Sequence, residues 1–181
     1  NWTGGESGSA NWMFLSNSLF ERQLTPTVNN RNVLKLQFGQ TYRQDSESKD
    51  WMAPEKSNDL IDFESMFRFD LGAWADPFAS GRLESQFADR GDPDNPVYFN
   101  PVTLTESAGA AKVLIKEEKR DWTIRLGAGL RQHIEREVPD PLDGSRGTET
   151  STDGGLEFVN DMRMPLAGGR INLKSKLIVF Q

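Results

Sequence analysis

The sequence contains no cysteine and no long apolar run, and each absence excludes a class of protein. Without cysteine, the chain has no disulfides and no thiolate metal sites. No stretch of roughly 18 apolar residues occurs, so the sequence predicts no membrane-spanning helix. The negative mean hydropathy of −0.61 does not exclude a membrane β-barrel, because barrel strands need an apolar side chain only at every second position.

Basic residues are also in the minority. The chain has 21 Lys and Arg against 27 Asp and Glu, which gives a formal net charge of −6. Nucleic-acid binding draws its affinity from clustered basic side chains on phosphates. We therefore expect no nucleic-acid partner.

What the sequence does contain is alternation of apolar and polar residues with a period of two. Ile61, Phe63 and Phe67 fall on one side of a stretch in which Asp62 and Glu64 fall on the other. This pattern predicts β-strands with one apolar and one polar face, and almost no helix. The predicted strands cover residues 9–21, 34–43, 61–71, 78–88, 102–116, 122–135, 155–164 and 170–181.

The segments between these strands alternate in length. Short connections are expected at 24–30, 73–76, 116–121 and 165–169, and long polar ones at 44–58, 89–101 and 136–154. In a simple meander, all short turns then lie at one rim and all long loops at the other. This asymmetry is typical of outer-membrane barrels, so the predicted fold is an all-β, antiparallel up-and-down transmembrane β-barrel.

The strand count also leads to an expectation about completeness. The first and the eighth predicted strand both place a chain end at the rim of the long loops. Bacterial single-chain barrels usually have an even number of strands and periplasmic termini. We therefore expect residues 1–181 to be a single barrel domain that is incomplete at both ends, from a barrel of ten or more strands.

Alternation alone leaves open which face lies inside. In a soluble lipocalin-like barrel the apolar face lines a ligand cavity, whereas in a membrane barrel it meets lipid. Small residues assigned to the apolar faces, such as Gly109 and Ala111, would fill a closed interior poorly and favour lipid contact. Aromatic residues near the strand ends also favour lipid contact, because membrane barrels carry girdles of aromatic residues at both membrane interfaces. These aromatics are Trp12, Phe20, Tyr42, Phe78, Phe87 and Trp122.

Three motifs resemble a known family. They are Asn1–Ser7 (NWTGGES), Pro101–Ser107 (PVTLTES) and Asp153–Phe158 (DGGLEF). They are similar to an uncharacterised family of outer-membrane β-barrels of Bacteroidota and related bacteria, known as a domain of unknown function. The resemblance runs over most of the chain. It implies location in the cell outer membrane, with the lipid bilayer as partner, and carries no assigned activity or site residues.

Acidic and basic residues occur in similar number on the polar faces. If the apolar faces meet lipid, the polar faces line a lumen, where charges persist only when paired or hydrated. We therefore predict ion pairs between neighbouring strands. The lumen is either plugged by its own side chains or a narrow hydrated pore that passes small solutes, and the sequence leaves both open. The predicted network comprises Lys35, Asp62, Glu64, Arg68, Arg82, Glu84, Arg125, Arg131, Glu157, Asp161 and Arg163.

Two further groups of residues are candidates for catalysis or metal binding. His133, the one histidine, falls on a polar face, but no nucleophile motif accompanies it, so a hydrogen-bonded lumen residue is favoured over a catalytic one. Asp89, Asp92 and Asp94 gather oxygen ligands in one predicted loop, as Ca²⁺ prefers, although the full EF-hand pattern is missing. No other cofactor is expected.

These observations favour a non-enzymatic outer-membrane β-barrel that is either a passive channel or a structural or surface-interaction protein. The first alternative is a soluble lipocalin-like carrier of an apolar ligand. The second is an outer-membrane lipid hydrolase that uses His133.

Overall fold

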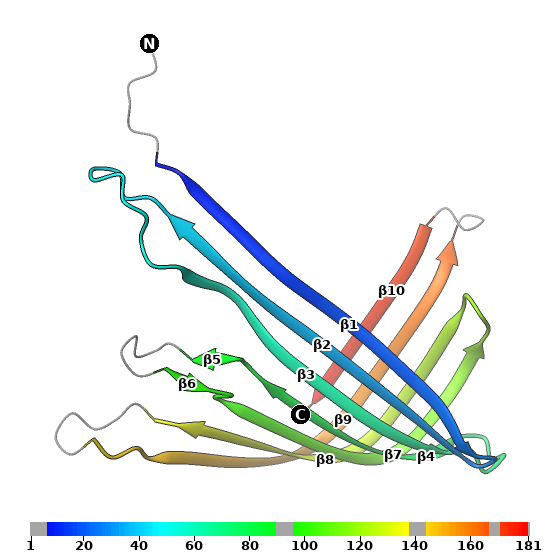
Figure 1. The fold of residues 1–181 in the computed structure, drawn as a ribbon. Coiled ribbons are helices and arrows are strands. Elements are labelled where there is room, and N and C mark those ends of the chain that lie inside the picture. Colours follow the sequence, from blue (N-terminus) through cyan, green and yellow to red (C-terminus); the bar gives the residue numbers. More distant parts are fainter. Residues whose placement is uncertain (1–6, 90–95, 138–143, 167–170, 181) are drawn as a thin grey trace.

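A single eight-stranded antiparallel sheet dominates the computed structural model, which describes residues 7–89, 96–137, 144–166 and 171–180. The order of strands in the sheet follows the chain (Figure 1). This confirms the predicted all-β meander of eight strands. Its strands are β1 (Ser9–Thr25), β2 (Val28–Arg43), β3 (Glu55–Phe69), β4 (Asp76–Ser85), β7 (Val102–Lys116), β8 (Asp121–Arg136), β9 (Thr148–Leu166) and β10 (Ile171–Phe180).

Several strands begin earlier than the alternation predicts. β2 begins at Val28, β3 at Glu55 and β9 at Thr148, whereas apolar alternation starts at residues 34, 61 and 155. The added residues are mostly polar, yet they pair in register with the neighbouring strand. Backbone hydrogen bonds of a ladder do not require apolar side chains, so apolar alternation marks only part of each strand.

The connections alternate in length as predicted. Short ones join β1 to β2, β3 to β4 and β7 to β8, and long ones join β2 to β3, β4 to β7 and β8 to β9. The long connections lie at the left end of the sheet in Figure 1. The connection between β4 and β7 contains a small hairpin that the sequence did not predict, formed by β5 (Ala88–Asp89) and β6 (Val97–Tyr98). The described ranges contain no helix that is long and apolar enough to cross a membrane.

The sheet curls into a half-barrel, so that β1 to β3 pass across β9 and β10 (Figure 1). Lys116 at the end of β7 lies 2.9 Å from Glu21 in β1, although four strand steps separate these strands in the sheet. Only side chains on a concave face can meet over such a separation. The charged residues of the alternating pattern therefore lie on the concave face, and their apolar neighbours lie on the convex face.

The convex face is apolar and largely open. Phe63 and Phe67 are each 40% exposed, and Leu126 is 60% exposed. These side chains belong to the predicted apolar faces of their strands. They pack against no second layer in the described part of the chain, and the one cluster of buried apolar residues, Met66, Phe78 and Ala111, lies on the concave side.

Three residues lie on the opposite face from the one predicted. Phe78, Gly109 and Ala111 are concave, because the ladder sets Phe78 beside Gly109 and Ala111 beside Arg125. Alanine and glycine occupy both faces around residues 108–111, so the alternation of apolar and polar residues does not show which side chains share a face there. Position 127 requires glycine, because a Cβ there would lie 2.6 Å from the backbone oxygen of Ala108 and 3.1 Å from the Phe78 ring.

Candidate functional site: the charged concave face

One cluster of charges joins three neighbouring strands. The Nζ of Lys35 in β2 lies 2.6 Å from the Asp62 carboxylate in β3. Arg82 in β4 donates to both oxygens of the same carboxylate, from Nε at 2.8 Å and from Nη2 at 3.1 Å, and this Nη2 also lies 2.8 Å from Glu84. Asp62 is buried, so each of its oxygens exchanges water for a cationic donor. This cluster has the geometry that the sequence predicted.

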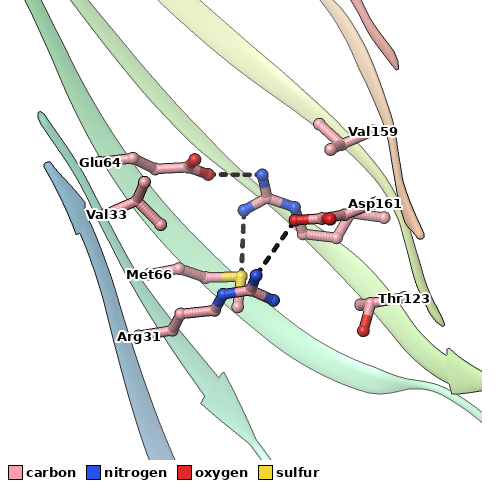
Figure 2. Close-up of a pocket in the computed structure, with 8 residues that line it drawn as sticks. Arg31, Val33, Glu64, Met66, Thr123, Val159 and Asp161 are labelled. Carbon is pink, nitrogen blue, oxygen red and sulfur yellow. Dashed lines mark hydrogen bonds and ion pairs between the residues drawn. The ribbon is translucent and has the colours of Figure 1, made fainter. Parts of the chain in front are cut away.

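Two further ion pairs span the concave face instead of joining neighbours. Arg125 in β8 lies 2.5 Å from Glu64 in β3, and Arg31 in β2 lies 3.1 Å from Asp161 in β9 (Figure 2). Along the sheet, the strands of the first pair are three positions apart and those of the second pair are five positions apart. At ordinary strand spacing, these separations correspond to about 14 and about 24 Å. These two pairs do not join adjacent strands as predicted, because curvature brings opposite walls together.

The Arg125–Glu64 pair is enclosed. The two side chains are only 6% and 10% exposed. Arg125 also lies 3.0 Å from the Met66 sulfur, and its guanidinium stands over the Phe78 ring at 5.4 Å. The ring of Phe78 has room there because Gly127 presents no side chain.

The space left between these side chains is small. A cavity of about 20 Å³ lies among the residues drawn in Figure 2, including Val33, Thr123 and Val159. That volume holds roughly one water molecule. At this level the concave side is filled by its own side chains.

A hydroxyl chain occupies the next part of the concave face. The Ser107 hydroxyl donates to the Glu157 carboxylate, and the Ser80 and Ser107 oxygens are 2.8 Å apart. Ser107 and Glu157 are both buried. Sequence reasoning included Glu157 as an ion-pair partner, but missed the serines. The serines lie on the same face of β4 and β7 as the predicted charges, and this position in the alternating pattern could have identified them.

The structure places the remaining predicted charges, Arg68, Arg131 and Arg163, elsewhere on the concave face. Arg68 lies 3.7 Å from Asp76. Arg131 is half-buried on the same face, opposite Thr105 in the ladder. Arg163 is exposed, and within the described ranges it makes no ion pair. Sequence reasoning missed Arg31, although its parity matches that of Lys35.

His133 lies near the long-loop end of the concave face. Its Nδ1 is 3.0 Å from the Thr103 hydroxyl, and its Nε2 is 3.6 Å from the Glu135 carboxylate. The predicted hydrogen-bonded role is consistent with these contacts. They also bring a hydroxyl, an imidazole and a carboxylate together.

The predicted Ca²⁺ loop lies mainly outside the described residues, since Asp92 and Asp94 fall within 90–95. Asp89 accepts a hydrogen bond from the Asn100 side chain at 3.0 Å. Across the described ranges, no group of three or more His, Asp or Glu is placed to hold a metal ion. Ca²⁺ binding by this loop stays a prediction.

Fold and site together define an antiparallel β-meander, curled into a half-barrel, whose concave face carries interlocking charges. Residues 1–90 match a family described as "Protein of unknown function (DUF3078)". The match covers β1 to β5, while the motifs at 101–107 and 153–158 lie beyond it. No curated protein and no solved structure matches the chain.

Proposed function

We propose that this chain forms part of an outer-membrane β-barrel whose convex face meets lipid and whose interior is closed by ion pairs. Its role is structural or surface-interacting, and it is not a passive channel. The observation that carries this proposal is the pair of bridges, Arg125 to Glu64 and Arg31 to Asp161, between opposite walls of the concave face.

The dimensions of the convex face support contact with lipid. On β8 that face runs from Trp122 to Ile134, and a tilted strand needs about 9–11 residues to span a bilayer. Aromatic side chains mark both ends of the band. The Phe38 and Trp12 rings lie 5.7 Å apart towards the long loops, and Trp74 is 82% exposed at a short turn.

The same geometry disfavours a soluble carrier of apolar ligands. Such a carrier needs an apolar interior, whereas the concave face holds Asp62, Glu64 and Arg125. The long loops, which are tied together by Asn100 through hydrogen bonds to Asp89 and Arg136, offer a shaped rim for contacts outside the bilayer.

Extraction and conductance test the proposal. We expect the protein to leave the membrane only with detergent, and to give little steady current in a planar bilayer. Replacing both Glu64 and Arg125 by Ala removes one bridge and is expected to raise the current. Arg120→Ala, at an exposed turn, is the control and is expected to leave the current unchanged.

Two results would contradict this reasoning. Recovery of the protein in the soluble fraction without detergent would remove the lipid-facing placement. An unmodified protein that conducts as well as the double variant would remove the closed interior.

A second candidate follows from the contacts of His133. A hydroxyl beside an imidazole that also faces a carboxylate is the arrangement of an activated nucleophile, which would suit a lipid hydrolase. In that case His133→Ala and Thr103→Ala each abolish hydrolysis of a phospholipid ester. Unchanged hydrolysis in His133→Ala, or none in the unmodified protein, would eliminate this function.

A further inference from the structure

The convex face is hollowed where β3, β4, β7 and β8 lie side by side. The hollow has a volume of about 730 Å³. Larger side chains stand on both sides of it, Phe67 in β3 and Leu130 in β8. Its floor is lined by small residues of β4, β7 and β8, namely Ala79, Gly81, Ala108 and Ala128. The apolar convex face therefore has a recess that its own side chains do not fill.

Gly81 belongs to this floor, and the fold of the single chain does not require a glycine there. Apart from its chain neighbours, a Cβ at position 81 would have no heavy atom within 4 Å. Its backbone does not need glycine either, because the described glycines with positive φ are Gly72 and Gly144. Glycine inside a strand lowers stability, and it often marks a place where another backbone approaches closely. Position 81 therefore suits close contact with a second molecule.

Gly81 stands between an unused donor and an unused acceptor. The ladder sets Ser65 of β3 on one side of it and Glu106 of β7 on the other. Glu106 is exposed, and it makes no hydrogen bond or ion pair within the described ranges. The Ser65 oxygen accepts from Asn30 at 3.4 Å, while its own hydroxyl hydrogen has no acceptor in the described part of the chain. A carboxylate without a donor is unfavourable on an apolar face, so a partner that supplies one would offset this cost.

We propose that this hollow is the contact between two copies of the chain, which pack convex face to convex face around a two-fold axis. An axis that passes over Gly81 and runs roughly along β4 places β3 of each copy opposite β7 of the other. Ser65 of each copy then lies opposite Glu106 of the other and donates its hydroxyl hydrogen to the carboxylate. Both copies keep the same orientation about this axis, so the dimer is compatible with a bilayer.

Side-chain size is complementary about the same axis. Two residues further along the strands, the ladder sets Phe67 and Ala108 on either side of Ala79. The ring of Phe67 in each copy therefore lies over Ala108 of the other, where the small side chain leaves room for it. Small residues on the axis let the two sheets approach closely. A second copy fits the hollow better than an acyl chain, because an acyl chain offers Glu106 no donor.

Thiol cross-linking tests the position of the axis, because the chain contains no cysteine. In Gly81→Cys the two thiols lie close together at the axis, and we expect a short bis-maleimide to join them into a covalent dimer. The reaction is run in the fraction that holds the protein, whether membrane or buffer, so it is independent of the lipid-facing placement. Gly154→Cys is the matched control, because it lies in the same row of the convex face but three strand positions from β4. Similar cross-linking of both variants, or none in Gly81→Cys, would overturn the proposal and leave the hollow to lipid or another protein.

Sedimentation equilibrium, in density-matched detergent where the protein requires it, measures the dissociation constant of the dimer. Gly81→Leu fills the hollow and should weaken the dimer at least about tenfold, whereas Gly154→Leu should leave it unchanged. Glu106→Leu makes the face more apolar but removes the acceptor, so it should also weaken the dimer about tenfold, and adding Ser65→Ala should change little more. Circular dichroism confirms that each variant is folded. Stronger association in Glu106→Leu would overturn the proposal, because it would indicate nonspecific apolar contact.

Discussion

Removal of the Arg125 side chain should be among the most damaging single changes in the described sheet. Arg125→Ala removes the ion pair at 2.5 Å from the Glu64 carboxylate, which is only 10% exposed. The change also removes the contacts of Arg125 with the Met66 sulfur and the Phe78 ring. Breaking a buried ion pair by deleting one partner typically costs about 3–5 kcal/mol, so we expect a loss of this order in the free energy of unfolding.

Urea unfolding in detergent micelles, followed by tryptophan fluorescence, measures this loss. Arg120→Ala is the control, because Arg120 and Glu117 form an ion pair whose side chains are 46% and 58% exposed. Exposed pairs contribute about 0–1 kcal/mol, so the control should lose little. The double variant with Glu64→Ala should recover part of the stability lost in Arg125→Ala, since the cost of burying the Glu64 carboxylate is then removed as well. If Arg125→Ala costs no more than Arg120→Ala, the two walls are not joined by this pair in the folded protein.

Three other predictions follow from single positions. Glu106 is exposed in the middle of the convex face without an ion-pair partner in the described ranges, so Glu106→Leu should raise the free energy of unfolding in micelles by about 1 kcal/mol, and a loss would argue against lipid contact. Gly127→Val should cost about 1–3 kcal/mol in the same assay because its Cβ would lie 2.6 Å from the backbone oxygen of Ala108 and 3.1 Å from the Phe78 ring, whereas Gly81→Ala opens into free space and should be nearly neutral. Hydrogen bonds from loop backbone N–H groups, foremost that of Ser48, lower the pKa of Asp45 below its ordinary value of 3.8. These hydrogen bonds should help to order loop 44–54 fully above pH 3.8, and their contribution should be lost as the pH falls through the lowered pKa of Asp45. An NMR titration would detect this as the Asp45 carboxyl signal moving at lower pH than in a peptide of the same sequence.

The sequence predicts those parts of the fold that depend on strand parity. Residues 61–69 alternate so clearly that both faces of β3 follow from the pattern. Around residues 108–111 the pattern fails, because alanine and glycine stand on both faces and neither face is marked by size or polarity. The ends of β2 and β9 were missed for a similar reason, since polar residues there still pair through their backbones.

Parity also cannot predict which charges meet across a curved sheet. It places Arg31, Lys35 and Asp161 on one face, but every strand in a flat sheet would contact only its two neighbours. The Arg31–Asp161 contact depends on the summed twist and curl over five strand steps, which no single strand encodes.

The same contact helps to explain why the concave face is filled beside Arg125. Where Arg125 meets Glu64, each side chain is neutralised by its partner, and the walls close to about 20 Å³. Arg31 and Asp161 line the same small cavity, so a second bridge between opposite walls closes it. Ion pairs between opposite walls therefore hold the curled sheet together at this level. Loss of either partner of the Arg125–Glu64 pair should accordingly destabilise the fold.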